Sequence, residues 1–229
     1  MLPVAILAGG LGTRLYPLTE KIPKALIEIN GEPFLAHQLR LLRARGIQRV
    51  VLCIGQYGDR IREYAGDGAR FGVNIDYSAD GAVLLGTAGA VRKALPLLGQ
   101  DFFVIYGDSY LPCSYAGVAQ AYQAAGLPGL MTVNRNEGRW DASNVEFANG
   151  RILAYDKKNR TARMRYIDYG LGVFNRAAFE GRQADLADVY GDLLRHGRLA
   201  ACEVAGRFYE IGSFHGIAEL ARHLAESQS

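Results

Sequence analysis

The hydrophobic positions in the first half of the chain form short apolar runs that alternate with stretches of helical spacing. The predicted strands are residues 4–8, 26–29, 49–54, 74–77 and 101–106, and the predicted helices are 33–45, 59–65 and 87–98. Strands that alternate with helices in this way are typical of βαβ units with parallel strands. The pattern therefore predicts an α/β fold with a doubly wound sheet.

After residue 128 the pattern changes to short strands separated by turn residues. Strands are expected at 130–134, 144–147, 152–156 and 166–174, and helices return at 184–195 and 214–225. A length of 229 residues fits a single α/β domain. We expect one domain over 1–229, in which the strand-rich half, 129–229, forms a lid or subdomain on the sheet of 1–128.

Composition excludes several classes of protein. The chain is 49% hydrophobic, which excludes intrinsic disorder, and its net charge of only +3, without a long basic run, argues against a nucleic-acid partner. The uncharged stretch 109–134 is long enough to span a bilayer, but Gln120, Gln123 and the break at 127–129 favour a neutral helix followed by a strand, so no membrane partner is expected. Three separated cysteines and no basic leader favour a cytoplasmic protein.

A glycine-rich segment, Gly9-Gly10-Leu11-Gly12-Thr13-Arg14, directly follows Leu7 and Ala8 of the first strand. Glycines allow backbone N–H groups to approach a phosphate closely, and Arg14 adds a charge that can bind two oxygens at once. Leu15 stands where a dinucleotide fingerprint needs glycine, and no Walker A sequence occurs. Taken alone, the segment is either an anion-binding loop or a plain turn, and Lys24 is either a phosphate ligand or a solvated lysine.

Asp108 follows the predicted strand 101–106, one residue past Gly107. Ligands of open α/β sheets bind at the carboxyl ends of the strands, where the glycine loop also opens. A carboxylate there is a suitable ligand for Mg²⁺, and a helix-capping or turn aspartate is the alternative.

Six segments in order along the chain resemble the sugar nucleotidyltransferases, also called NDP-sugar pyrophosphorylases. They are the glycine loop followed by Pro23-Lys24, Leu85-Gly86-Thr87-Ala88-Gly89, Tyr106-Gly107-Asp108, Tyr155-Asp156-Lys157, Ile167-Asp168-Tyr169-Gly170 and Tyr209-Glu210-Ile211-Gly212. The chain is most similar to the short bacterial members that act on heptose 1-phosphate (guanylyltransferases) or N-acetylmuramate 1-phosphate (uridylyltransferases). The resemblance implies a Rossmann-like, three-layer α/β/α sheet of the glycosyltransferase-A type.

The resemblance also implies the site residues. Arg14, Lys24 and Asp108 would be catalytic, with Asp108 and Glu210 holding Mg²⁺, although relatives usually carry Asp or Asn at the position of Glu210. The expected nucleotide-binding residues, in the half 1–128, are Leu7, Ala8, Gly9, Gly10, Gly12, Thr13, Gly81, Gly86, Thr87 and Gly107. The expected sugar-binding residues, in the half 129–229, are Asn144, Asp156, Lys157 and Asp168.

The implied reaction joins a nucleoside triphosphate and a sugar 1-phosphate into an NDP-sugar and pyrophosphate, a step in making cell-envelope polysaccharide. The sugar phosphate is already ionised at neutral pH and needs no general base, which agrees with histidines that show no catalytic spacing. Two alternatives stay open: a cytidylyltransferase for a polyol or choline-type phosphate, and a nucleotide-binding module without turnover. The base, the sugar and the choice between a monomer and a small homo-oligomer also stay open, although the acceptor-only Asp168 favours a neutral sugar.

Overall fold

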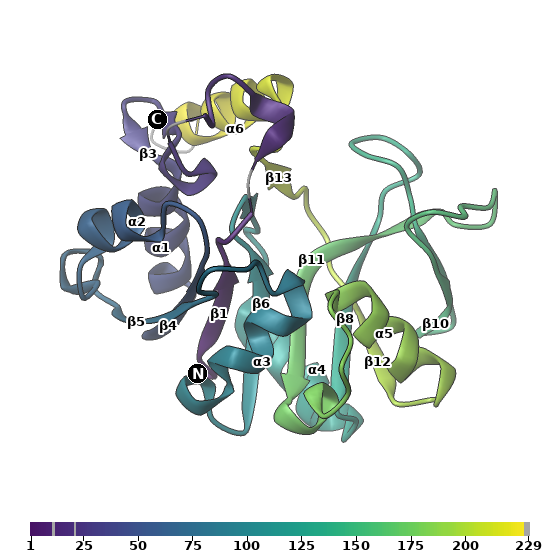
Figure 1. Cartoon of the computed structure of the whole chain (residues 1–229). Helices are drawn as coiled ribbons and strands as arrows, with labels where there is room; N and C mark the ends of the chain where they lie inside the picture. The colour runs from purple at the N-terminus through teal and green to yellow at the C-terminus, as the bar shows by residue number, and fades with distance from the viewer. Residues whose placement is uncertain (11, 21, 227–229) are drawn as a thin grey trace.

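A mixed, nine-stranded sheet forms the centre of the molecule (Figure 1). The structure is a computed structural model that describes residues 1–10, 12–20 and 22–226, so Leu11 of the glycine loop and Lys21 lie outside the described residues. Four parallel strands lie in the order β6 (Asp101–Tyr106), β1 (Val4–Leu7), β4 (Arg49–Ile54) and β5 (Asn74–Ala79). These four strands are distant in sequence, but because they are parallel their carboxyl ends lie along one edge of the sheet.

The second half of the chain extends the same sheet. The long strand β11 (Tyr166–Asn175) runs antiparallel to β6 and also pairs with β8 (Gly129–Arg135), which in turn pairs with β12 (Leu199–Glu203). A hairpin of β9 (Val145–Ala148) and β10 (Arg151–Tyr155) joins the start of β11 at Tyr166. The strands expected to form a lid are thus hydrogen-bonded into the main sheet.

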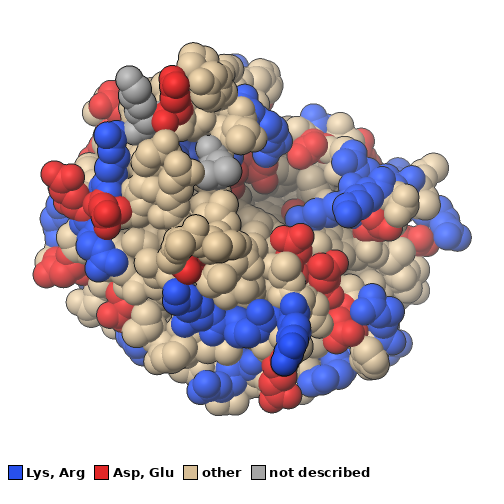
Figure 2. Space-filling view, viewed as in Figure 1, with Lys and Arg blue, Asp and Glu red and all other residues tan. Residues whose placement is uncertain are grey.

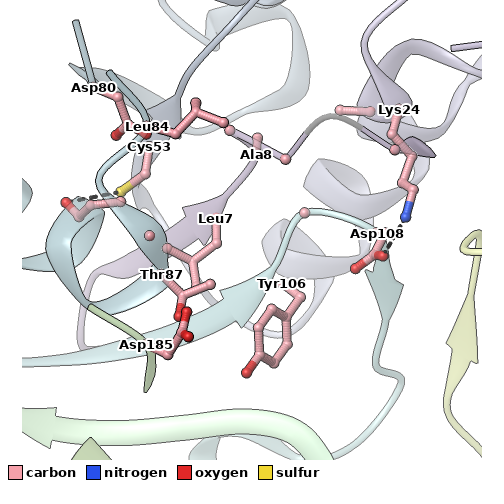
Figure 3. A pocket seen from close by; sticks show the side chains of 17 residues that line it. Leu7, Ala8, Lys24, Cys53, Asp80, Leu84, Thr87, Tyr106, Asp108 and Asp185 are labelled. Carbon is pink, nitrogen blue, oxygen red and sulfur yellow. Dashed lines mark hydrogen bonds and ion pairs between the residues drawn. The ribbon is translucent and has the colours of Figure 1, made fainter. Parts of the chain in front are cut away.

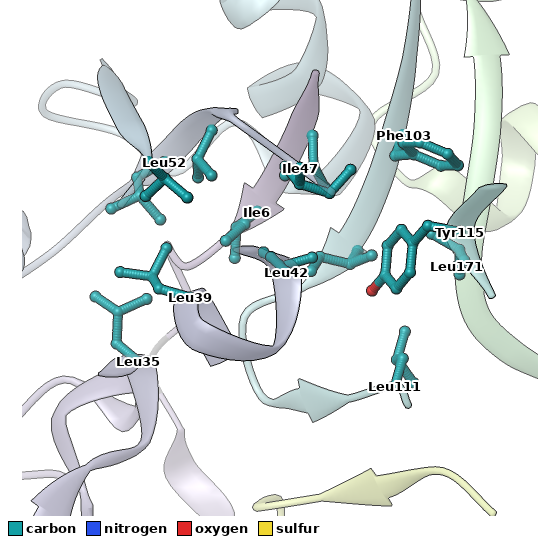
Figure 4. Packing of buried hydrophobic residues seen from close by; sticks show 14 of the residues in the cluster. Ile6, Leu35, Leu39, Leu42, Ile47, Leu52, Phe103, Leu111, Tyr115 and Leu171 are labelled. Atoms are coloured by element: carbon teal, nitrogen blue, oxygen red, sulfur yellow. The ribbon is translucent and has the colours of Figure 1, made fainter. Parts of the chain in front are cut away.

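Helices cover both faces of the sheet because the strand residues alternate between them. On β1, Val4 and Ile6 belong to one core cluster and Ala5 belongs to the other. The first face is covered by α1 (Phe34–Ala44), α2 (Gly58–Ala65) and α4 (Tyr115–Ala125), and the second by α3 (Gly86–Leu98) and α5 (Leu186–Arg195). Figure 4 shows the first cluster, in which Leu39 and Leu42 of α1 pack beside Ile6.

The last helix, α6 (Phe214–Glu226), packs over the segment that follows the glycine loop. Its Leu220 and Leu224 join Leu15, Ile27 and Phe34 in a third buried cluster. The short pairs β2 (Glu28–Ile29) with β3 (Glu32–Pro33) and β7 (Ser109–Tyr110) with β13 (Tyr209–Glu210) lie outside the main sheet. The remaining elements are single 3₁₀ turns: Thr13–Leu15, Lys24–Leu26, Ala69–Phe71 and Arg176–Phe179.

The predicted α/β class and the order of its strands and helices are confirmed, with three local differences. The strand expected at 26–29 begins only at Glu28, because Lys24–Leu26 forms a 3₁₀ turn. β12 was not predicted, since its residues are half-buried and show no clear alternation, and β7 and β13 are only two residues long. In the stretch 109–134, α4 is followed by β8, and no helix of the described ranges is long and apolar enough to cross a membrane.

Gly107 allows β6 to approach β1 at the edge where the glycine loop begins. Its N–H donates to the Leu7 carbonyl at 3.0 Å, and a Cβ at this position would lie 2.7 Å from that oxygen and 2.8 Å from Ala8 Cα. Both contacts are with backbone, so a side chain would force the two strand ends apart.

We therefore expect Gly107→Ala to lower the free energy of unfolding by about 1–3 kcal/mol, the usual range for overpacking a buried position. Urea titration measures this change. Gly191→Ala in α5 is the matched control: its Cβ would meet only the flexible end of Arg195 at 3.5 Å, and alanine favours the helix. Equal stability of Gly107→Ala and the wild type would contradict the close-approach argument.

Candidate active site

A cavity of about 270 Å³ opens at the carboxyl ends of β1, β4 and β6. Figure 2 shows this face of the molecule hollowed, with acidic and basic side chains around the hollow. Figure 3 shows the residues that line the cavity, with Lys24 and Asp108 on one side and Asp80, Thr87 and Asp185 on the other. Of the residues predicted to bind nucleotide or to be catalytic, the lining includes Leu7, Ala8, Gly9, Gly10, Gly12, Lys24, Gly86, Thr87, Gly107 and Asp108.

The glycine loop is fixed at Gly12 by hydrogen bonds from residues outside the loop. Gly12 has a φ of +62°, in the left-handed region, and its carbonyl accepts a hydrogen bond from the buried Thr19 hydroxyl at 2.8 Å. The Leu15 N–H donates to the same carbonyl at 2.9 Å. Because these bonds use the Gly12 carbonyl, the acceptor faces the protein and not the cavity.

Lys24 and Asp108 form an ion pair at one end of the cavity, with 2.8 Å between Nζ and Oδ2. The turn that carries Asp108 is fixed by Gln38 of α1, whose Nε2 donates to the carbonyls of Tyr106 at 3.1 Å and Ser109 at 2.8 Å. Both side chains of the pair are mostly buried, with exposures of 15% and 22%. The site therefore holds a cation and a carboxylate in fixed positions before any substrate binds.

Glu210 lies beside Asp108 because β13 pairs with β7. Glu210 is opposite Ser109 in that register, and the Ile211 N–H donates to the Asp108 carbonyl at 3.0 Å. Burial, together with the negative charges of Asp108 and Asp141, raises the pKa of Glu210 to about 7, while Arg14 and Lys24 act in the opposite direction.

Arg14 faces a second, more polar cavity of about 200 Å³, which it lines together with Glu210, Trp140 and Arg207. A Cβ on Gly212 would lie 3.2 Å from the Arg14 guanidinium and 3.9 Å from Asp108 Oδ2, so Arg14 approaches the same carboxylate from this side. Asp108 thus lines the main cavity, and the neighbouring Glu210 lines the second one.

The donor set around Asp108 fits a magnesium ion that is completed by substrate. The described residues contain no group of three or more His, Cys, Asp or Glu side chains placed to hold a metal. Mg²⁺ is commonly bound by one or two carboxylates together with water and substrate phosphates, and Asp108 with Glu210 offers that number.

Three of the four predicted sugar-binding residues, Asn144, Lys157 and Asp168, form a cluster that meets the main cavity at Tyr106. Lys157 Nζ lies 3.6 Å from Asp168 Oδ2 and donates to the Tyr106 hydroxyl at 3.4 Å. Burial and then the charge of Asp168 raise the pKa of Tyr106 to about 12, so the phenol stays protonated at neutral pH. Burial opposes the charge of Lys157, but Asp168 and Tyr106 outweigh it and raise its pKa, so the ammonium persists.

Asp168 is held from several directions. Its Oδ2 accepts from the Tyr155 hydroxyl at 3.2 Å, its Oδ1 accepts from the Gly170 N–H at 3.1 Å, and its N–H donates to Asn144 Oδ1 at 2.9 Å. The Asp168 side chain is only 2% exposed, whereas that of Lys157 is 42% exposed. This geometry favours Lys157 as the group that meets a substrate, with Asp168 behind it.

Six predicted residues line neither cavity: Thr13, Gly81, Asn144, Asp156, Lys157 and Asp168. Three of them, Thr13, Gly81 and Asp156, also lie outside the cluster at Tyr106. Asp156 turns back on its own loop and accepts from the N–H groups of Lys158 at 2.7 Å and Asn159 at 2.8 Å. Gly81 is exposed with a φ of +97°, and Thr13 is exposed in the turn before Arg14. Their roles in binding stay predictions.

Other lining residues were not predicted from sequence. Asp80 follows β5 directly, so the strand-end rule that identified Asp108 would also have found it. Tyr106 lay inside a recognised motif, but its apolar strand favoured a core role. Asp185 comes from the distant segment before α5, where the Ala184 carbonyl accepts from the Ala88 N–H at 2.8 Å, and no sequence signal marked that contact.

Comparisons with known proteins agree with this geometry. Residues 4–226 match the family model described as nucleotidyl transferase. The chain is 40% identical over 124 residues to N-acetylmuramate alpha-1-phosphate uridylyltransferase of Neisseria meningitidis, which covers 54% of this chain and 53% of that protein. It is 29% identical to mannose-1-phosphate guanyltransferase beta-B of Xenopus laevis (90% and 60% covered) and 26% identical to glucose-1-phosphate thymidylyltransferase of Streptomyces griseus (97% and 66% covered). The chain thus spans between about half and two thirds of the length of these relatives.

Solved structures share the fold. HddC from Yersinia pseudotuberculosis superposes with a TM-score of 0.80 at 22% identity, covering 98% of this chain and 100% of that one. A UDP-glucose pyrophosphorylase superposes with a TM-score of 0.81 at 18% identity, covering 99% of both chains.

The raised pKa of Glu210 predicts how a variant changes stability with pH in metal-free protein. Between its ordinary value of 4.5 and about 7, the folded state binds a proton that the unfolded state has lost, so this group makes stability fall as pH rises. Glu210→Gln should therefore equal the wild type in unfolding free energy near pH 4, and exceed it by about 1–3 kcal/mol at pH 8.

Urea unfolding in EDTA at both pH values measures the difference. Glu203→Gln, an exposed glutamate at the end of β12, is the control and should show no such trend. A Glu210→Gln variant that is less stable than the wild type at pH 8 would show that the carboxylate is stabilised where it lies.

Proposed function

The chain belongs to the nucleotidyl transferase family, and from this premise we propose that it transfers a nucleotidyl group from a nucleoside triphosphate to a sugar 1-phosphate. The observation that carries the proposal is the juxtaposition of two sites. A glycine-lined cavity ends at the Lys24–Asp108 pair, and the Lys157–Asp168 pair meets that cavity at Tyr106. The relatives that match the chain carry names of uridylyl-, guanylyl- and thymidylyltransferases, which supports the reaction class without selecting a base.

In the proposed reaction, an oxygen of the sugar 1-phosphate attacks the α-phosphorus of the triphosphate. A new P–O bond forms, the bond from the α-phosphorus to the bridging oxygen breaks, and pyrophosphate leaves with its electron pair. The attacking oxygen is already ionised, so no side chain has to remove a proton. The difficulty is to bring two polyanions together in line, and fixed cations and N–H groups remove much of that cost.

Each cation of the site has a distinct part in this proposal. The amides of the glycine loop and Arg14 would bind the triphosphate and the leaving pyrophosphate, and Lys24 would neutralise charge at the reacting phosphates. Lys157, which is more exposed than its partner Asp168, would bind the phosphate or hydroxyls of the sugar. Asp108 and Glu210 would hold Mg²⁺, which when bound supplies positive charge to the phosphate oxygens.

Release of pyrophosphate over a panel of nucleoside triphosphates and sugar 1-phosphates tests the function. We expect release to require both substrates and to stop in EDTA. Lys24→Ala should lower kcat/KM by about two to four orders of magnitude, because its ammonium acts on charge in the transition state. Arg14→Ala should have an effect of the same order.

Lys158→Ala is the control for lost charge, because this exposed lysine lies in the loop beyond Lys157. It should retain wild-type turnover, and thermal unfolding should show that all variants are folded. Near-normal turnover in Lys24→Ala would remove that residue from the mechanism. Turnover of choline or polyol phosphates in place of every sugar phosphate would overturn the assignment of the acceptor.

The Lys157–Asp168 pair predicts a separation between the two substrates. Asp168→Asn removes the charge that orients Lys157, so KM for the sugar phosphate should rise by about ten- to a hundredfold, the range for one charged hydrogen bond. KM for the nucleoside triphosphate should stay within about twofold, because Asp168 does not line the main cavity. An equal rise in both constants would show a general loss of structure in place of a role at the sugar.

A further inference from the structure

We infer that the Asp80 carboxylate, supported by Asp185, reads the base of the nucleotide and makes this site prefer guanine. The inference rests on the proposed function only in taking the main cavity as the nucleotide site. It is carried by two carboxylates at the end of the cavity that lies away from Lys24 and Asp108 (Figure 3).

The distance between Asp80 and Asp108 in the sheet suits a nucleotide that has its α-phosphate at Asp108 and its base at Asp80. Asp108 follows β6 and Asp80 follows β5, and the order β6-β1-β4-β5 puts three strand spacings between them, roughly 14 Å at 4.7–4.9 Å per spacing. A nucleotide whose α-phosphate lies at Asp108 therefore extends across β1 and β4, with its base toward Asp80.

The contacts of Asp80 leave its carboxylate able to accept more hydrogen bonds. Oδ2 accepts from the Leu85 N–H at 3.3 Å, and a Cβ on Gly9 would lie 3.5 Å from the same oxygen. Lys93 approaches the same residue, but its Nζ donates to the Asp80 main-chain carbonyl at 3.1 Å. The carboxylate is therefore positioned at the wall of the cavity by one backbone N–H and has acceptor capacity remaining.

Asp185 is held at the cavity by the backbone on either side of it. The Ala184 carbonyl accepts from the Ala88 N–H at 2.8 Å, and the Leu186 N–H donates to Thr87 Oγ1 at 2.7 Å. Asp185 precedes α5 but makes no side-chain capping bond, and within residues 1–10, 12–20 and 22–226 its carboxylate has no hydrogen bond or ion pair. Among the described residues that line the cavity, Asp80 and Asp185 are the acceptors at this end, and the cationic Lys24 lies at the other.

Guanine is the base that matches such acceptors best. Its Watson–Crick edge presents N1–H and an N2 amino hydrogen side by side, two donors that one carboxylate can accept together. Uracil and thymine present a single N3–H between two carbonyl oxygens, which a carboxylate repels, and adenine and cytosine pair one amino group with an acceptor nitrogen. Specificity follows from both the attraction and the repulsion.

Binding without turnover tests the inference. Calorimetric titration of the wild type with GTP, ITP or UTP, each with Mg²⁺ and without sugar phosphate, should show GTP binding tighter than UTP and ITP by at least about tenfold. ITP is informative because it lacks only the N2 amino group. Asp80→Asn, whose amide offers one donor and one acceptor, should reverse the preference of GTP over UTP. Asp185→Asn should reduce that preference at least about threefold without reversing it.

Asp76→Asn is the matched control, because Asp76 is an exposed aspartate on the same strand, and it should leave every affinity unchanged. A wild type that binds UTP as tightly as GTP, or an Asp80→Asn variant with an unchanged ratio, would overturn the inference. If ITP matches GTP while 2′-deoxy-GTP binds weakly, the carboxylates read the ribose and the inference is wrong.

These outcomes are separable from failure of the proposed function. Preferential binding of GTP with no pyrophosphate release would overturn the transferase assignment and leave the base assignment intact. Release of pyrophosphate with UTP as the best substrate would overturn the base assignment and leave the transferase assignment intact.

Discussion

The close approach of β6 to β1 at Gly107 determines where every other part of the site can lie. The Gly107 N–H donates to the Leu7 carbonyl at 3.0 Å, so the end of β6 and the start of the glycine loop form one continuous wall. Gln38 fixes the turn from the side of α1, and the N–H of Ile211, directly after β13, donates to the Asp108 carbonyl. The turn that carries Asp108 is therefore held by three separate segments at the wall of the main cavity.

Two cations of the site are each placed by a neighbouring carboxylate. Lys24 pairs with Asp108 and Lys157 with Asp168, while Arg14 lies near both Asp108 and Glu210. A protein with a net charge of only +3 thereby keeps ordered cations at its active site without a strongly basic surface. The carboxylates limit how far the long cationic side chains can move before substrate arrives, which reduces the entropy lost on binding.

The sequence predicted what depends on local chemistry and missed what depends on packing between distant segments. The parallel strands followed from apolar runs, and the position of Asp108 followed from the rule that sites lie at strand ends. The roles of Lys24 and of the glycine loop were expected only from the family resemblance. Gln38 and Asp185 could not be found in this way, because their contacts join α1 to the β6–β7 turn and α5 to α3. The division into a nucleotide half and a sugar half stays a prediction, and Asp185 of the second half lines the same cavity as the glycine loop of the first.

The antiparallel pairing of β11 with β6 limits how the sequence of such a protein can evolve. Leu171 is paired with Ile105 and Val173 with Phe103 in that register, so separating the halves would expose an apolar strand edge to solvent and to aggregation. The halves cannot be exchanged between proteins as independent modules. Loops such as 136–144 and 156–165 lie outside this pairing and can change without breaking it, while the paired strands are inherited together.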